Sequence, residues 1–284
     1  MVERITDVDD PRLDPYRNLR DATLARHRSA SNGLFIAEGP FVVERVLGTS
    51  HRVVSVVVLP ERSARIVPLA QEAGVPVLEV SRETLAGVAG FDVHRGVLAC
   101  VERPSPTTLA DLAAIARGSG TIVACEGLTD AENLGAIIRS SAALGAGGLL
   151  IDATCADPLS RRAVRVSMGE SLEMPCARVD DWPGALGELR RDGWWVIALT
   201  PHGTSVSLAT ALESQSSIVL MVGSEGPGLS TGAIAAADVA AHIPMTGPAD
   251  SLNVAAATAI ALYERSRASG PATRVESSSR AASA

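Results

Sequence analysis

Short apolar runs alternate with segments of helical periodicity along the first hundred residues. The stretch from Val53 to Leu59 is continuous and rich in β-branched side chains, which is typical of a strand covered on both faces. Before it, Val42, Val43 and Val46 recur at the spacing of one helix face. The pattern predicts a small α/β sandwich, with strands near 34–37, 53–59, 75–80 and 95–102 and helices near 15–28, 40–47 and 64–73.

Turn and breaker residues interrupt this pattern between residues 102 and 120. The stretch begins with RPSPTT and ends with GSG, around a short predicted helix near 109–117. A second α/β unit follows. Its expected strands lie near 121–125, 148–151, 176–179, 194–199, 217–222 and 240–243, and its expected helices near 133–145, 182–191, 229–236 and 252–268.

These patterns divide the chain into a first domain at 1–103, a linker at 104–120, a second domain at 121–268 and a tail at 269–284. The tail has few large apolar side chains to bury, so we expect it to be disordered. A length of 284 residues agrees with two domains, at roughly 150 residues for each.

The charge balance narrows the classes of function. A formal net charge of −7 argues against a protein that coats nucleic acid without specificity, because such a protein needs a basic face. Aromatic residues make up 3% of the chain, which disfavours a single-strand binder that stacks bases. All 25 basic residues are Arg, a bias that phosphate recognition or a GC-rich genome would each produce.

The four cysteines show no metal-binding pattern. There is no C-x-x-C, and no His stands at a ligand spacing to a Cys, so we expect no structural zinc site. The first residues, MVERITDVDD, are acidic and polar rather than typical of a signal peptide. No apolar run approaches 18 residues without a charge or a turn residue, so we expect a cytoplasmic protein.

Three blocks in the second domain carry candidate chemistry. The first, EGLTDAENLGAIIR at 126–139, follows a predicted strand and enters a helix, in which the apolar face leaves Arg139 pointing the other way. Helix capping by Asn133 and solvation of Arg139 would explain this block on structural grounds alone. Capping would also place the Asn133 side chain at the carboxyl edge of the sheet, where open α/β sheets bind ligands.

The second block, LMVGSEGPGLS at 220–230, ends a strand in a glycine-rich loop with Glu225 at its centre. Glycines allow positive φ and a close approach of the backbone to a ligand. The spacing G-x-x-G-x-G is neither a P-loop nor a dinucleotide-binding fingerprint, and an ordinary tight turn would explain the block equally well.

The third block is IPMTGPADSLNVAAA at 243–257. Ser251 stands where a helix should begin, and Asn253 lies in its predicted first turn. Capping and tight packing of small residues would account for this block alone. They do not account for three polar-tipped loops in this order at corresponding strand ends.

Together the blocks resemble the SpoU (TrmH) family of RNA 2′-O-ribose methyltransferases, which belong to the SPOUT class. The residues that match its three motifs are Asn133, Gly135 and Arg139, then Gly223, Glu225, Gly226, Gly228 and Leu229, and then Ile243, Pro244, Met245, Gly247, Ser251, Leu252, Asn253 and Val254. Between them, Arg165, Ser167, Gly169 and Pro175 also resemble the pattern. The family commonly has Pro, Asn and Ser where this chain has Ala131, Ser224 and Ala255.

The first domain resembles the family's accessory RNA-binding domain, which is similar to a small ribosomal-protein fold. The matching segments are FIAEG at 35–39 and RGVLA at 95–99. The resemblance therefore implies an N-terminal RNA-binding α/β sandwich, a C-terminal α/β methyltransferase domain with a trefoil knot, and a homodimer.

The same resemblance implies methyl transfer from S-adenosylmethionine to a ribose 2′-hydroxyl of structured RNA, with ribosomal RNA favoured over transfer RNA. The cofactor would lie among the loops that carry Thr200, Gly223, Ile243, Met245 and Leu252. No metal is needed, because the leaving group departs neutral.

The expected roles in catalysis follow from the same motifs. Arg139 would stabilise the developing alkoxide rather than act as a base, because a guanidinium remains charged. Asn133, Ser251 and Asn253 would orient the ribose hydroxyls, and Glu225 would fix the loops and the Arg. The candidate RNA contacts are Arg17, Arg20, Arg26, Arg28, Arg161, Arg162 and Arg165.

Two other functions remain open at this point. One is a non-catalytic RNA-binding or ribosome-associated protein that keeps the fold, against which the intact motif residues weigh. The other is a nucleotide-dependent oxidoreductase on a Rossmann sheet, which the absence of G-x-G-x-x-G after a first strand disfavours.

Overall fold

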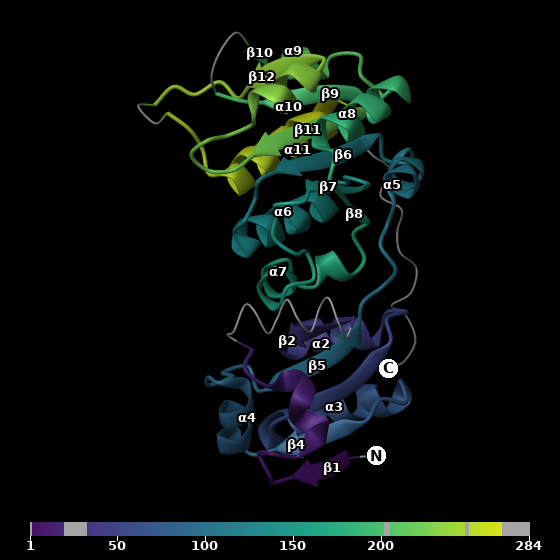
Figure 1. The fold of residues 1–284 in the computed structure, drawn as a ribbon, viewed down its shortest axis with the longest axis vertical. Helices are drawn as coiled ribbons and strands as arrows, with labels where there is room; N and C mark the ends of the chain where they lie inside the picture. The colour runs from purple at the N-terminus through teal and green to yellow at the C-terminus, as the bar shows by residue number, and fades with distance from the viewer. Residues whose placement is uncertain (1, 20–32, 202–204, 248–249, 269–284) are drawn as a thin grey trace.

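The computed structural model describes residues 2–19, 33–201, 205–247 and 250–268. These residues form two α/β units that follow one another along the long axis of the molecule (Figure 1). The expected fold class is confirmed, because the similar structures reported below share it.

The first unit is built on a five-stranded mixed sheet with the order β1-β4-β3-β5-β2. Its strands are β1 (Val2–Ile5), β2 (Leu34–Glu38), β3 (Val53–Val58), β4 (Val77–Val80) and β5 (Val97–Glu102). The pairs β1/β4 and β3/β4 are parallel, whereas β5 runs antiparallel to both β3 and β2. The edge strand β1 was not predicted, because only Ile5 of its four residues is buried and no apolar run marks it.

Helices cover both faces of this sheet. The helices α2 (Pro40–Leu47) and α3 (Pro60–Glu72) pack on one face, and η1 (Pro11–Tyr16) and α4 (Arg82–Ala89) pack on the other. The prediction of an α-helix from residue 15 is wrong where the chain is described. Residues up to Tyr16 form a 3₁₀ helix instead, and Pro15 has no N–H with which to extend an α-helical ladder.

The second unit is built on a seven-stranded sheet in which every pair is parallel, with the order β10-β12-β9-β11-β6-β7-β8. Its strands are β6 (Thr121–Glu126), β7 (Gly148–Asp152), β8 (Cys176–Val179), β9 (Trp195–Leu199), β10 (Val206–Ser207), β11 (Ile218–Gly223) and β12 (Val239–His242). The central strands β6 and β11 are buried almost throughout, as parallel strands covered on both faces should be.

Successive side chains of these strands enter two apolar layers. One layer contains α6 (Ala131–Ala143), α9 (Leu208–Leu212) and α11 (Val254–Ala268), and the other contains α5 (Leu109–Ala116), α8 (Trp182–Arg191) and α10 (Thr231–Ala236). Helix α5 lies within the stretch expected to be a linker, yet Leu112 and Ala116 are fully buried in the second layer. That stretch is therefore packed onto the second unit.

The short elements α7 (Arg161–Val166) and η2 (Glu170–Leu172) lie between the two units (Figure 1). They belong by sequence to the second unit, and α7 contacts both α6 and β2. Neither element was predicted, because six and three residues are too short to show a helical period.

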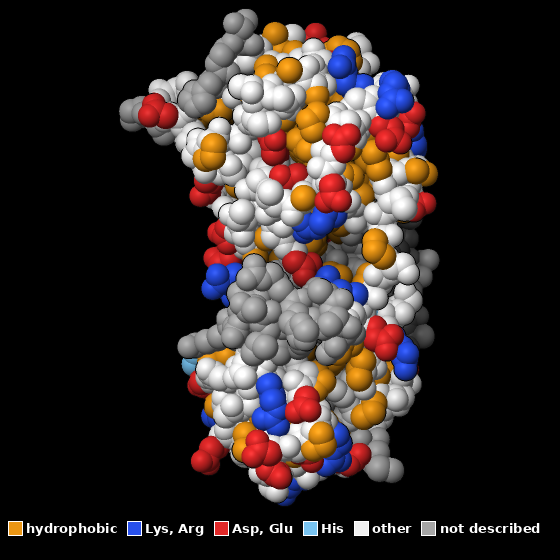
Figure 2. Space-filling model, viewed as in Figure 1, with side chains coloured by type: hydrophobic (Ala, Val, Ile, Leu, Met, Phe, Trp, Pro, Cys, Tyr) orange, Lys and Arg blue, Asp and Glu red, His pale blue; other side chains and the backbone are white. Residues whose placement is uncertain are grey.

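The outer surface carries charges of both signs. On the face drawn in Figure 2, acidic and basic side chains lie interspersed over both units. Within the described ranges, no helix is both long enough and apolar enough to cross a membrane.

Candidate active site

A cavity of about 710 Å³ lies where strands β9, β11 and β12 end. Its walls come from residues 199–201, 222–229, 243, 245 and 251–254, with Ile234 and Ala257. The cavity thus lies at the carboxyl ends of parallel strands, where open α/β sheets bind their ligands. The volume falls within the range of roughly 300–1,000 Å³ usual for small-molecule sites.

The cavity brings together residues that are far apart in the sequence. All five predicted cofactor-binding residues line it, namely Thr200, Gly223, Ile243, Met245 and Leu252. Glu225, Ser251 and Asn253 line it as well. The walls thus combine apolar side chains with polar groups and exposed backbone, a composition suited to a ligand that has both an apolar ring and charged groups.

The glycine loop after β11 folds back closely onto the end of its own strand. A Cβ atom on Gly223 would lie 2.3 Å from both the carbonyl carbon of Gly228 and the amide nitrogen of Leu229. Gly226 and Gly228 adopt φ angles of +92° and +70°, which side chains disfavour. These glycines are therefore required by the shape of the loop that forms one wall of the cavity.

Glu126, at the end of β6, holds the far end of this loop. Its two carboxylate oxygens accept hydrogen bonds from the backbone N–H of Ser230, at 2.8 Å, and from the Ser230 hydroxyl, at 2.7 Å. The sequence reasoning did not assign Glu126 a role. Its position directly after a buried strand, at the start of the first block, was the one feature of the sequence that indicated a role for it.

A hydrogen-bonded triangle joins the three motif blocks at the rim of the cavity. The Glu225 Oε1 atom accepts from Asn133 Nδ2, at 3.2 Å, and from Asn253 Nδ2, at 2.7 Å. Asn253 Nδ2 also donates to Asn133 Oδ1, at 3.0 Å. Three side chains from α6, the glycine loop and the start of α11 are thereby fixed relative to one another.

Both helices at this rim begin at residues other than those expected. Helix α6 begins at Ala131 and is capped by Asp130, so Asn133 lies in the first turn and is not the cap. Helix α11 begins at Val254, and Asn253 caps it by accepting from the amides of residues 255 and 256 at 3.0 and 3.2 Å. The expectation that the helix begins at Ser251 is wrong, because the Asn253 side chain satisfies the first free amides.

Arg139 lies outside the cavity. It is exposed on α6, six residues after Asn133, so the two side chains leave the helix in different directions. In the part of the chain that is described, no hydrogen bond or ion pair joins Arg139 to Glu225. Another cation, Arg162 of α7, pairs with Glu132 at the start of α6, at 3.3 Å.

The basic residues expected to contact RNA have several partners within the protein. Arg17 donates to Asp14 at 2.8 Å, close to it in the sequence. Arg161 forms an ion pair with Glu38 of the first unit, and Arg165 lies 3.8 Å from the same carboxylate. The expected RNA contacts that lie outside the described residues are Arg20, Arg26 and Arg28.

The cysteines on and after strands β6, β7 and β8 are poor nucleophiles. Burial raises the pKa of both Cys155 and Cys176 to about 12, and burial raises the pKa of Cys125 well above its usual range. The thiols are therefore neutral at physiological pH. Among the described residues, no group of three or more His, Cys, Asp or Glu side chains is placed to hold a metal ion.

Comparison with known proteins identifies the family of the chain. The sequence profile of the SpoU rRNA methylase family matches residues 120–263, and that of the RNA 2′-O ribose methyltransferase substrate-binding domain matches residues 36–107. A Mycobacterium tuberculosis protein, described as an uncharacterized tRNA/rRNA methyltransferase, is 41% identical over 278 residues, which cover 96% of this chain and 95% of that protein.

Solved structures share the fold over nearly the whole chain. The AdoMet-bound rRNA methyltransferase from Sinorhizobium meliloti has a TM-score of 0.78 and 31% identity, covering 94% of this chain and 98% of that one. The SpoU methyltransferase AviRb from Streptomyces viridochromogenes, in complex with AdoMet, has a TM-score of 0.77 and 26% identity, covering 91% and 98%.

Proposed function

Since the chain belongs to the SpoU rRNA methylase family, we propose that it transfers a methyl group from S-adenosylmethionine to a ribose 2′-hydroxyl of structured RNA. The observation that carries this proposal is the cavity at the strand ends, with the triangle of Asn133, Glu225 and Asn253 at its rim. The profile matched by residues 36–107 supports an RNA substrate. We favour ribosomal over transfer RNA, because the accessory domain suits a large folded RNA.

The cavity fits S-adenosylmethionine, which is present in two of the similar structures. When bound, it supplies a methyl group on a positively charged sulfur that leaves as a neutral thioether. Leu199, Ile243 and Leu252 provide apolar walls for an adenine ring, and the close-packed backbone at Gly223 provides polar atoms for the ribose. The carboxylate of Glu225 lines the same cavity and attracts a cation.

The triangle at the rim orients the acceptor. Because Glu225 accepts from both asparagines, each amide is held in one orientation and cannot rotate freely. Ser251 is exposed and lines the cavity beside Asn253, so its hydroxyl is placed to bond a ribose. Alignment of the ribose oxygen with the methyl donor is then the main contribution of these residues to the rate.

Arg139 completes the site across a homodimer interface. It is exposed on α6, outside the cavity of its own chain, and the adjacent helix α11 exposes Ile260 and Tyr263 by 42% and 56%. Pairing of these helices with a second copy would cover the apolar side chains and bring Arg139 to the partner's cavity. There the guanidinium would stabilise the alkoxide as the proton leaves.

These assignments complete the organisation of the chain. We assign residues 1–103 to RNA binding and 121–268 to a SpoU catalytic domain with a trefoil knot; residues 104–120 connect them and pack through α5 on the second unit. The tail is at 269–284. We expect the enzyme to act in the cytoplasm, on RNA that is already folded.

The test of this function is the variant Arg139→Ala. Removing the cation should lower methyl transfer to ribosomal RNA by about 10²- to 10³-fold. Circular dichroism and the calorimetric affinity for S-adenosylmethionine should stay as in the wild type, because Arg139 is exposed and is proposed to contact the acceptor oxygen rather than the cofactor. Arg191→Ala, on the opposite side of the sheet, is the matched control. Unchanged transfer by Arg139→Ala would contradict the assignment.

The dimeric site has its own test. Mixing equal amounts of Arg139→Ala and Glu225→Ala protomers creates heterodimers in which one site contains both wild-type residues. Transfer should then recover to about a quarter of the wild-type rate if sites are shared between protomers. No recovery would show that each chain works alone.

A further inference from the structure

The two units share one apolar core. Val164 of α7 is fully buried and Leu172 of η2 is 7% exposed, and both pack in the same cluster as Val42, Val43 and Val46 of the first unit. We call this contact, made by residues 161–173 against β2 and α2, the interunit seam. Because the side chains interdigitate as in a domain interior, the seam resists sliding of one unit over the other.

A buried ion pair lies at one end of the interunit seam. Glu38 ends β2 and its side chain is 6% exposed, yet it carries a carboxylate. Arg161 pairs with it, and Arg165, one turn further along α7, lies 3.8 Å away. The Arg161 guanidinium also stacks 4.7 Å over the ring of Phe91. A buried carboxylate without a cationic partner has a large free-energy penalty of desolvation. The pairing therefore favours the arrangement in which the two units stay together.

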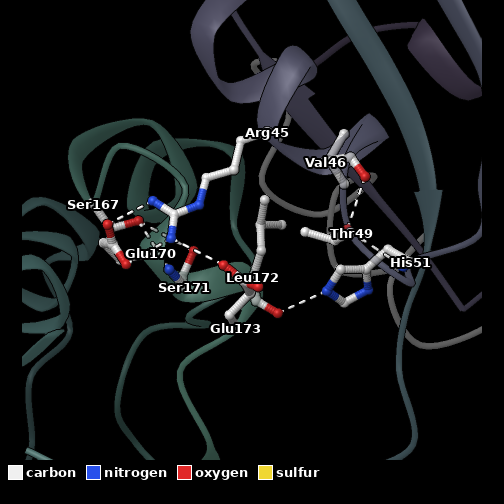
Figure 3. Close-up of polar contacts among 9 residues, drawn as sticks. All are labelled: Arg45, Val46, Thr49, His51, Ser167, Glu170, Ser171, Leu172 and Glu173. Atoms are coloured by element: carbon white, nitrogen blue, oxygen red, sulfur yellow. Dashed lines mark hydrogen bonds and ion pairs between the residues drawn. The ribbon is translucent and has the colours of Figure 1, made fainter. Parts of the chain in front are cut away.

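A second group of polar contacts lies at the other end of the interunit seam (Figure 3). Arg45 of α2 donates to both oxygens of Glu170, at 2.5 and 2.8 Å, and to Glu173 at 3.0 Å. These contacts raise the pKa of Arg45. His51 Nε2 lies 2.7 Å from the carbonyl oxygen of Leu172. The first unit therefore forms ion pairs with both ends of the segment 161–173.

The opposite side of α7 rests on the helix that carries the catalytic asparagine. A Cβ atom on Gly135 of α6 would lie 2.8 Å from the Ala163 carbonyl oxygen and 3.0 Å from Val166 Cβ. Only a glycine at this point lets the two helices approach so closely. Gly135 is two residues from Asn133, so α7 makes direct contact with Glu38 on one side and with the catalytic helix on the other.

We propose that Glu38 is a positioning residue for RNA methylation, because its pairing with Arg161 and Arg165 sets the position of the RNA-binding unit relative to the cavity. This inference rests on the proposed function. A target nucleotide reaches the methyl donor only if the RNA is held at the correct distance from the cavity, and the interunit seam fixes that distance. The segment with Arg165, Ser167 and Gly169 is accordingly a docking element, and Arg161 acts through Glu38.

The variant Glu38→Gln tests the proposal, because it keeps the shape of the side chain and removes its charge. We expect transfer to folded ribosomal RNA to fall by about 10- to 100-fold in kcat/KM, as misplacement of a substrate does. The affinity for S-adenosylmethionine should remain within about twofold, because the cavity is intact. Glu61→Gln, which breaks an exposed ion pair with Arg82 inside the first unit, is the matched control.

A distance measurement separates positioning from a merely structural role. Spin labels at the exposed positions Glu72→Cys and Glu188→Cys report the separation of the two units. The distribution of distances should broaden in Glu38→Gln and stay narrow in the control. Reversing the pair, with Glu38→Arg and Arg161→Glu together, should restore part of both the narrow distribution and the transfer rate. If the reversed pair does not fold, Arg161→Met should reproduce the Glu38→Gln phenotype.

Three results would overturn the proposal or its premise in distinguishable ways. Unchanged transfer and unchanged distances in Glu38→Gln would remove the positioning role. Lost transfer with a wild-type distance distribution would also overturn it, and would assign Arg161 and Arg165 to direct contact with RNA. A wild-type chain that binds no S-adenosylmethionine and methylates no RNA would contradict the proposed function, while the label distances would still decide whether Glu38 fixes the two units.

Discussion

Two carboxylates in this protein each interact with two nitrogen-bearing side chains, but one lies at the cavity and the other between the two units. Glu225 is exposed at the cavity and binds the neutral amides of Asn133 and Asn253. Glu38 is buried at the interunit seam and faces the cations Arg161 and Arg165. The first arrangement leaves a net negative charge beside the cavity, whereas the second carries a surplus positive charge that is largely covered.

This difference in exposure and pairing explains why Glu225 can contribute to a ligand site, whereas Glu38 can only stabilise a contact within the protein. An uncompensated exposed carboxylate attracts a cationic ligand, and a sulfonium is such a ligand. A buried carboxylate that is already paired has no such capacity, and it stabilises only the arrangement that keeps its partners close. Both sites also depend on glycines where chain segments cross closely, so substitution of those glycines tests each region separately.

The largest effect, a loss of affinity for S-adenosylmethionine, is expected from Gly223→Ala. The new Cβ atom would overlap the backbone of Gly228 and Leu229, which cannot move aside without opening the loop. We expect a loss of at least about 100-fold in calorimetric affinity for S-adenosylmethionine, or nearly 3 kcal/mol. The label distances across the interunit seam should not change. Gly232→Ala, in α10, is the control and should bind normally, because its added Cβ would make only an ordinary contact, 3.9 Å from Ser230 Oγ. Normal binding by Gly223→Ala would show that the loop is not a wall of the cofactor site.

A smaller effect is expected from Gly169→Ala, at the seam. Gly169 adopts a φ of +83°, and an added Cβ would lie 2.9 Å from Arg45 Cδ. The Arg45 side chain can shift, at the expense of its bond to Glu170, so the main cost is the left-handed backbone. We expect thermal unfolding to report a loss of about 1–2 kcal/mol, with cofactor affinity unchanged.

The control for that measurement is Gly187→Ala in α8, where nothing lies within 4 Å of the new atom and φ is not positive. That variant should be slightly more stable than the wild type, by roughly 0.5–1 kcal/mol, because alanine favours a helix. A Gly169→Ala protein as stable as the wild type would contradict the expected cost of the left-handed backbone at this position.

The smallest effect is expected from thiol reagents. With a pKa of about 12, roughly one Cys155 thiol in ten thousand is ionised at pH 8, and only the thiolate reacts. Iodoacetamide should therefore leave Cys155 and Cys176 unmodified in the native protein at pH 8, as measured by intact mass. Because the pKa is raised, the modified fraction should grow as pH rises and not as it falls. Rapid modification at pH 8 would show that the apolar packing around β7 and β8 opens readily.

Much of the fold was predictable from local pattern. Val53–Val58 and Thr121–Glu126 are strands because their apolar runs have no other stable environment. The cavity residues came from the resemblance to the family's motifs, which Gly223 and Leu252 match, and not from periodicity; both line the cavity. Helix starts were less certain, because Asp130 and Asn133 are both good capping residues and only the folded chain shows which one is used.

The interunit seam could not be predicted in this way. Glu38 and Arg161 are 123 residues apart, and neither carries a mark of its partner in the sequence. Val164 lies in a helix of six residues, which is too short for periodicity to reveal that it packs into another unit. Arg161 and Arg165 were expected to belong to a local patch of Arg side chains that contacts RNA. Their pairing with a buried carboxylate depends on tertiary packing alone.

The shared apolar core has a consequence for the order in which the protein is made. The first unit leaves the ribosome with β5 complete at Glu102, well before Val164 and Leu172 are synthesised. Until those two side chains are synthesised, the apolar surface beside Val42 and Val46 is exposed. Glu38 likewise has no Arg161 or Arg165 with which to pair. The nascent first unit therefore exposes part of its apolar surface, which favours aggregation, until the middle of the second unit has been synthesised.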